Sequence, residues 1–285
     1  MHPRPKTRLS RLNELKVRIH KDQNSAKFVE ESGERVSNPI IWIASRGLIS
    51  SLRGGVGLSL SIAYVSACAV YTFSLYPYFI DGEPSLRPMF EFIPFLLTLL
   101  APTLTLDIIA ADRQNRQLDV WLATPISYPS LLLGKLGGAW LLFMLATSVS
   151  LCIPLLLSQY VSLHWPSILT GYLGVALLGT MYLCIGLWSS VRANNPLSAW
   201  LSSFSICFLF YLIGVSARFL PPSLAEWSQL LSTQVHFERL TIGMIDTRDL
   251  IYFFGMILYW FTLAVETLRH QVNETIRIKK REQTI

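Results

Sequence analysis

Charged residues leave long gaps along the chain, and these gaps alternate with short polar segments. Five stretches contain no Asp, Glu, Lys or Arg: residues 54–80, 92–106, 136–191, 193–217 and 250–265. An α-helix needs about 20 apolar residues to cross roughly 30 Å of hydrocarbon. The longest gap is sufficient for two crossings, and SQYVSLHWPS (158–167) predicts a turn at its middle. The pattern predicts six membrane spans, at 56–79, 89–110, 131–157, 167–190, 197–217 and 249–268.

Two further segments have apolar positions at helical spacing but are too polar to cross. In NPIIWIASRGLISSLRGG (38–55), Arg46 and Arg53 interrupt the apolar residues, which predicts an N-terminal interfacial helix in the headgroup plane. The alternative is a cytoplasmic extension of the first span. After Pro221 and Pro222, apolar residues recur at helical spacing and predict an amphipathic helix at the outer surface: Leu224, Trp227, Leu230, Leu231 and Val235.

The outer segment ends in residues that are typical of helix boundaries. Gly243 is typical of a helix C-terminus, where the backbone often turns into the left-handed region. Asp246, with Asp249 three residues later, predicts the N-cap of the last span.

Composition supports this reading of the pattern. The chain of 285 residues is 52% hydrophobic and only 15% charged, whereas about a quarter of the residues of a soluble domain are charged. Lipid is therefore the expected solvent for most of the fold. The predicted fold class is an all-α integral membrane protein with six transmembrane helices.

The distribution of Lys and Arg predicts the orientation. With six spans, all but four of the 24 Lys and Arg residues fall on the side of the two termini. Positive residues favour the cytoplasmic side, so both termini are expected to be cytoplasmic. The predicted organisation is a basic cytoplasmic tail (1–36), a membrane domain (37–270) and a second cytoplasmic tail (271–285). The net charge of +6 suits anionic lipid headgroups, and no nucleic-acid partner is expected.

Residues that could carry catalysis or bind a metal are scattered. All four cysteines fall within spans, as small buried hydrophobic residues do: Cys68, Cys152, Cys184 and Cys207. The five histidines are isolated and do not have metalloprotease spacing. The acidic residues Asp107 and Glu266 lie near the cytoplasmic ends of spans, where ion pairs with Arg113 or Arg269 are expected. We predict a non-catalytic chain without a metal site.

Gly134 and Lys135 form a Gly-Lys pair of the kind that closes a phosphate-binding loop. That loop requires a glycine five residues before the second one and a Ser or Thr after the lysine. Pro129 and Leu136 occupy those two positions. We therefore expect no nucleotide site in this chain and place Lys135 near the cytoplasmic headgroups, at the start of the third span.

The segment between the second and third spans, ADRQNRQLDVWLATPISYPS (111–130), is polar and then apolar. Leu118, Trp121 and Leu122 share one face of a predicted short amphipathic helix. Charged residues occupy much of the rest: Asp112, Arg113, Arg116 and Asp119. Such a helix is either a surface loop or a docking element for a soluble partner.

Two blocks of sequence resemble a known family. The run PTLTLDIIAADRQNRQLDVWLATPIS, followed by LLLGK, looks like permease subunits of ABC-2 type transporters. The run STQVHFERLTIGMIDTRDLIYF (232–253) is similar to the segment before the last span of the gliding-motility-associated and nitrous-oxide-reductase-maturation permeases. GYLGVALLG (171–179) and IGLWSS (185–190) fit the fourth span of the same subgroup.

The resemblance implies a transmembrane permease subunit in the bacterial cytoplasmic (inner) membrane. Two copies of a separate ABC ATPase would hold ATP and magnesium, this chain would bind no cofactor, and a second permease subunit, identical or different, would complete the transporter. The segment between spans two and three would be the coupling helix that contacts the ATPase: Asp112, Arg113, Asn115, Arg116, Leu118, Asp119 and Trp121. The family motif before the last span comprises His236, Phe237, Glu238, Gly243, Asp246, Arg248 and Asp249.

The match departs from the family pattern within the coupling segment. Arg116 and Gln117 replace the family's Gly-Thr pair, and Asp119 replaces its glutamate, so the contact would suit a particular ATPase. Small residues on the spans, such as Gly137 and Gly179, would permit close helix packing. The expected function is coupling of ATP hydrolysis in the partner to export or translocation of a substrate. The alternatives are a membrane mechanotransmitter or anchor without substrate flux, and an enzyme or channel that works alone.

Overall fold

The computed structural model describes residues 39–53, 56–75, 86–106, 108–115, 118, 121, 126–160, 162–216 and 232–282. Within these ranges the secondary structure is helical, without strands. The elements are α2 (Pro39–Arg53), α3 (Val56–Val70), the π-helix η1 (Tyr71–Leu75), α4 (Arg87–Thr105), α5 (Ala110–Gln114), α7 (Tyr128–Ser150), α8 (Cys152–Leu157), α9 (Trp165–Arg192), α10 (Pro196–Ser216), α12 (Thr233–Thr241) and α13 (Thr247–Glu282).

Five stretches of helix in the described part are long and apolar enough to cross a membrane. They are Arg87–Gln114, Tyr128–Leu157, Trp165–Arg192, Pro196–Ser216 and Thr247–Glu274, and they coincide with predicted spans two to six. The predicted first span corresponds to α3 and η1, whose apolar part, Gly57–Phe73, is shorter than these five. Residues 76–79 of that prediction lie outside the described residues. The first span, and with it the count of six, thus stays a prediction.

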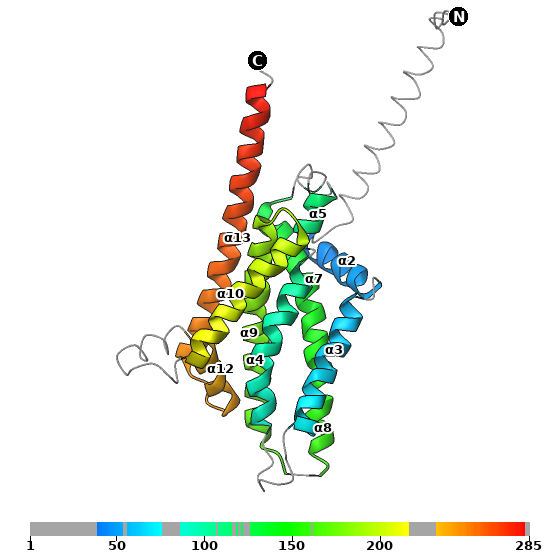
Figure 1. Cartoon of the computed structure of the whole chain (residues 1–285), viewed down its shortest axis with the longest axis vertical. Helices are drawn as coiled ribbons and strands as arrows, with labels where there is room; N and C mark the ends of the chain where they lie inside the picture. Colours follow the sequence, from blue (N-terminus) through cyan, green and yellow to red (C-terminus); the bar gives the residue numbers. More distant parts are fainter. Residues whose placement is uncertain are drawn as a thin grey trace, which may run out of the picture.

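Helix α9 is the centre of the bundle, and α4, α7, α10, α12 and α13 contact it (Figure 1). In the most apolar stretch of α9, 72% of the residues are buried, whereas in the corresponding stretch of α13 only 11% are buried. Glycines allow the neighbours to approach closely, because a Cβ at Gly171 would meet the ring of Phe90 at 2.6 Å and one at Gly174 the ring of Phe237 at 3.1 Å. This confirms the prediction that small residues provide close helix packing.

Helix α2 packs across the N-terminal half of α7 (Figure 1). A Cβ at Gly134 would lie 2.8 Å from the Cβ of Ile43, and one at Gly138 would lie 3.1 Å from the carbonyl oxygen of Ala44. Ile43 and Ala44 are buried in this contact, whereas Ile41 on the same helix is exposed. The glycine of the Gly-Lys pair is therefore a helix-packing position. The placement of α2 in the headgroup plane stays a prediction.

Enlarging Gly138 should weaken this packing. Gly138→Ala places a methyl group against the backbone of α2, and we expect a loss of about 1–3 kcal/mol in unfolding free energy. Gly255→Ala is the matched control, because a Cβ there meets nothing within 4 Å and alanine favours a helix over glycine. Thermal unfolding of the purified chain in detergent measures both. Equal unfolding temperatures for the two variants would contradict a tight contact between α2 and α7.

The polar segment before the last helix is ordered by local hydrogen bonds. The Ser232 hydroxyl caps α12 by accepting from the Val235 amide at 3.2 Å. Gly243 has φ 96°, and the Met244 amide donates to the Arg239 carbonyl at 3.2 Å, which is a Schellman ending. The predictions for Gly243 and the Asp246 N-cap are confirmed, since Asp246 Oδ1 accepts from the Arg248 amide at 3.0 Å.

Two further predictions, the outer amphipathic helix and the burial of the cysteines, are met only in part. Leu224, Trp227, Leu230 and Leu231 of the outer amphipathic helix lie outside the described residues; Val235 lies in α12 and is half-buried. Three of the four cysteines are buried free thiols, but Cys152 is exposed. The prediction of burial was wrong for Cys152 because its position begins α8, at the far end of the hairpin, where few helices pack against it.

Candidate functional site

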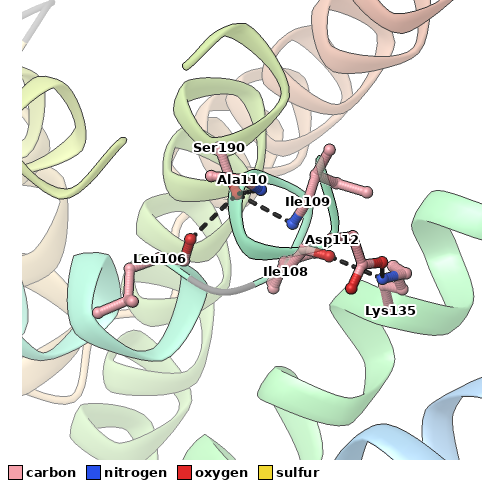
Figure 2. A network of polar contacts seen from close by, with 7 residues as sticks. All are labelled: Leu106, Ile108, Ile109, Ala110, Asp112, Lys135 and Ser190. Atoms are coloured by element: carbon pink, nitrogen blue, oxygen red, sulfur yellow. Dashed lines mark hydrogen bonds and ion pairs between the residues drawn. The ribbon is translucent and has the colours of Figure 1, made fainter. Parts of the chain in front are cut away.

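The segment between α4 and α7 is held against three other helices at one end of the bundle. Figure 2 shows the short helix α5 beside the C-terminal end of α9 and the first turns of α7. This is the end opposite the α7–α9 hairpin in Figure 1. Each of the contacts that hold α5 joins residues that are distant in sequence, so tertiary contacts fix the position of this segment in the bundle.

Ser190, on α9, holds the turn that precedes α5. Its hydroxyl oxygen accepts hydrogen bonds from the amides of Ile109 and Ala110, both at 3.1 Å. The hydroxyl donates to the Leu106 carbonyl at 3.4 Å (Figure 2). One donor and two acceptor positions are thus all used. Because Ser190 is fully buried, this hydroxyl satisfies backbone groups that the break between α4 and α5 would leave unpaired.

Lys135, on α7, forms an ion pair with Asp112 of α5 and donates to the Ile108 carbonyl at 2.8 Å (Figure 2). The two side chains are 13% and 14% exposed. The Lys135 ammonium also lies 5.6 Å from the ring centroid of Trp121. The position of Lys135 near the headgroups stays a prediction, and its side chain joins α5 to α7. The sequence gives no distance between α5 and α7, so it does not identify Asp112 as the partner of Lys135.

Arg113 attaches α5 to the ends of two further helices. Its guanidinium donates to the carbonyls of Val191 at 2.8 Å and Ala193 at 3.1 Å, and to Gln271 Oε1 at 2.6 Å. The two carbonyls belong to the last turn of α9 and its C-cap, where backbone acceptors lack helical partners. The expected partner Asp107 lies outside the described residues. Gln271, on α13, completes the set.

Of the two predicted cytoplasmic carboxylates, Glu266 does form the expected pair. Arg269 lies 3.7 Å from it, and both side chains are largely exposed. An exposed ion pair of this kind contributes little to stability.

The remaining predicted residues of the segment divide into buried and exposed positions. Leu118 is buried in the main hydrophobic cluster, and the ring of Trp121 lies edge-on to Trp42 of α2, with centroids 6.4 Å apart. Asn115 is exposed, as is its neighbour Gln114. Arg116 and Asp119 lie outside the described residues.

Sequence reasoning missed three residues that hold the segment: Ser190, Lys135 and Gln271. A lysine in the first two turns of an apolar helix is costly to bury unless a carboxylate is near, and this was a usable signal for Lys135. A serine in a span and a glutamine after one have no comparable signal.

The second predicted set surrounds a buried carboxylate at the other end of the bundle. Asp249, in the first turn of α13, is fully buried. Its Oδ1 lies 2.6 Å from His236 Nδ1 and 3.4 Å from an Arg239 nitrogen, both on α12. The His236 ring stacks on Tyr252 at 4.2 Å. The carboxylate therefore fixes α12 against α13.

The other members of this motif contact neighbouring residues of the bundle or form a turn. Phe237 packs on Gly174 of α9, and Glu238 Oε1 accepts from Gln234 Nε2 at 3.0 Å. Gly243 and Asp246 form the turn between the helices. Within the described ranges, no three His, Cys, Asp or Glu side chains come together as a metal-ligand set.

These features define a polytopic membrane protein with a charged segment anchored at one end of a helical bundle. The family model of ABC-2 family transporter proteins matches residues 13–276, most of the chain, and the protein belongs to this family. A comparison with curated proteins found no match. The chain is thus a multi-pass ABC transporter permease, a membrane transport component of a kind that normally works with an ABC ATPase.

Proposed function

We propose that the chain is a six-span permease subunit of the bacterial inner membrane, with α3 and η1 forming the first span and both termini in the cytoplasm. Two ABC ATPase subunits hold ATP and magnesium. A second permease subunit, identical or different, completes the transporter, which exports a substrate. The chain belongs to the subgroup of gliding-motility-associated and nitrous-oxide-reductase-maturation permeases, and the similarity of residues 232–253 to these proteins supports this assignment.

The anchoring of α5 is the observation that carries this proposal. Asp112 binds α7, Arg113 binds α9 and α13, and the backbone of the preceding turn binds Ser190 of α9. A force applied to α5 is therefore transmitted to three membrane helices. A surface loop without a mechanical role would not require these buried polar contacts, which are costly unless every group is paired.

The contacts of α5 support a division between residues that transmit movement and residues that contact the ATPase. Asp112 and Arg113 have their charges directed to partners inside the permease, so they cannot supply the main contact surface for an ATPase. Gln114 and Asn115 are exposed at the C-terminal end of α5. We assign the ATPase contact to these two residues and the transmission of movement to Asp112 and Arg113.

Asn115→Arg should therefore disrupt the complex with the ATPase while leaving the permease folded. A long cation at the contact leaves a desolvated charge without a partner, so we expect about a tenfold loss of co-purified ATPase. The tagged chain is purified from its native host, and an ATPase with a phosphate-binding loop is quantified by mass spectrometry. Asn194→Arg is the matched control, because Asn194 is also exposed and lies in the connection after α9.

Equal recovery of the ATPase with both variants would contradict the assignment of the contact to α5. Transport or ATP turnover by the isolated chain, without any ATPase, would contradict the permease function itself.

A further inference from the structure

A cavity of about 340 Å³ lies between the ends of α4, α10, α12 and η1. Four aromatic side chains line it, Tyr71, Phe92, Phe95 and Tyr211, together with Glu91 and Gln234. It is distant from the coupling segment, because the helix from Phe92 to Thr105 separates them by about 20 Å at 1.5 Å per residue. The contacts of α5 do not involve it.

The aromatic side chains form a connected wall. Tyr71 and Phe92 stack flat, with centroids 4.3 Å apart and planes at 3°. Phe95 is tilted by 41° to Phe92 and by 55° to Tyr211. Tyr71 begins the π-helix, a rare element that is frequent at functional sites. All four rings are half-buried, and the negative faces of such rings attract cations.

Glu91 gives this wall a negative charge. Its Oε1 accepts from Arg87 Nε at 3.1 Å, but the two residues line different cavities. Arg87 lines a separate one of about 270 Å³, beside His164. Among the described residues that line the aromatic cavity, Glu91 is the charged one, and its second carboxylate oxygen has acceptor capacity for a ligand.

Gln234 adds an acceptor without a donor. The side chain is 8% exposed, and its Nε2 donates to Glu238 at 3.0 Å, which orients the amide. Its Oε1 is buried and has no hydrogen-bond partner in the described part of the chain. Gly214 lets this oxygen lie close to α10, since a Cβ at that position would lie 2.9 Å from it. A buried acceptor without a donor is unfavourable, and an N–H group of a ligand would satisfy it.

We propose that this cavity binds an organic ammonium group, a protonated amine with an apolar substituent. The cation contacts the aromatic rings, and an N–H group of the ammonium donates to Glu91 or to Gln234. The group comes either from a lipid headgroup such as that of phosphatidylethanolamine or from a small soluble amine. The cavity does not include the residues assigned to the ATPase contact. The proposal also does not depend on which substrate the permease transports.

The test measures binding of protonated N,N-dimethylbenzylamine to the purified full chain in detergent, by saturation-transfer NMR. Isobutylbenzene, the neutral isostere, is the comparison. We expect saturable binding of the amine at least about tenfold tighter than that of the isostere. Glu91→Gln removes the charge but keeps an acceptor for Arg87, and Phe92→Leu removes a ring; each should weaken binding about tenfold.

Phe73→Leu is the matched control, because Phe73 lies in the same π-helix, is 53% exposed and does not line the cavity. It should retain the affinity of the unmodified chain. Amine binding no tighter than isobutylbenzene binding would overturn the proposal, as expected if a second copy of the chain fills the cavity. Unchanged affinity in Glu91→Gln and Phe92→Leu would overturn it too.

Native mass spectrometry separates the two sources. Retention of phosphatidylethanolamine over phosphatidylglycerol by the unmodified chain, lost in Glu91→Gln, supports a lipid headgroup. Saturable amine binding without retained lipid supports a soluble amine.

Discussion

Lys135→Met is expected to lower the unfolding free energy by about 3–5 kcal/mol, because it leaves the mostly buried Asp112 carboxylate without a partner. The side chains of the pair are 13% and 14% exposed, so solvent compensates little of the lost interaction. The variant also removes the hydrogen bond to the Ile108 carbonyl. For a chain of this size the apparent unfolding temperature should fall by on the order of 10 °C, measured by size-exclusion chromatography of heated samples in detergent.

The control is the double variant Asp112→Leu with Lys135→Met. Replacing both members of a buried ion pair by apolar residues is often neutral, so the double variant should recover most of the stability lost in Lys135→Met. In the cycle of two single variants and the double variant, the two single losses should then add up to clearly more than the loss in the double variant. Additive losses would show that the two charges act separately, and α5 would not be fastened to α7 through this pair.

The spans were predictable because a hydrophobic gap flanked by charges reports directly on the solvent of a helix. Predicted spans 167–190 and 197–217 agree closely with Trp165–Arg192 and Pro196–Ser216. The helix cap and the turn before the last span were predictable for a different reason. The Asp246 cap and the turn at Gly243 depend on neighbours within a few residues.

The contacts that fix the candidate site are not local. Arg113 and Gln271 are 158 residues apart, and Ser190 is 81 residues from Ile109. Hydropathy says which residues face lipid or protein but not which helices are neighbours. The sequence therefore indicated that 111–130 is a special segment, while its attachment to α7, α9 and α13 emerged only from the packing.

The same limit applies to the first predicted span. Its lack of charge is as clear as that of the others, but the described helix turns into a π-helix at Tyr71. Wider π-helical turns are rarely marked in sequence. The aromatic cavity beside Tyr71 likewise joins residues from four elements, and Gln234 is the one among the six residues named for it that lies in the family-like run 232–253.

Asp249→Leu is expected to cause a comparable loss at the other end of the bundle. Asp249 is fully buried, and its carboxylate contacts His236 at 2.6 Å and Arg239 at 3.4 Å. Removing the carboxylate eliminates its interactions with the His236 ring and the Arg239 guanidinium, and such a change costs about 3–5 kcal/mol of unfolding free energy in a buried network. Because α12 is held between α9 and α13, the loss should appear first as faster proteolysis in α12.

Asp246→Leu is the matched control, since it removes a carboxylate three residues earlier at a half-buried position, whereas Asp249 is fully buried. It eliminates only the N-cap hydrogen bond to the Arg248 amide, and a lost cap costs about 1 kcal/mol. Thermal unfolding in detergent and limited proteolysis compare the two variants. If both lose the same stability, Asp249 acts as no more than a helix-terminal charge. A larger loss in Asp249→Leu locates the stabilising interaction in the contact between α12 and α13, where His236 and Arg239 meet the carboxylate.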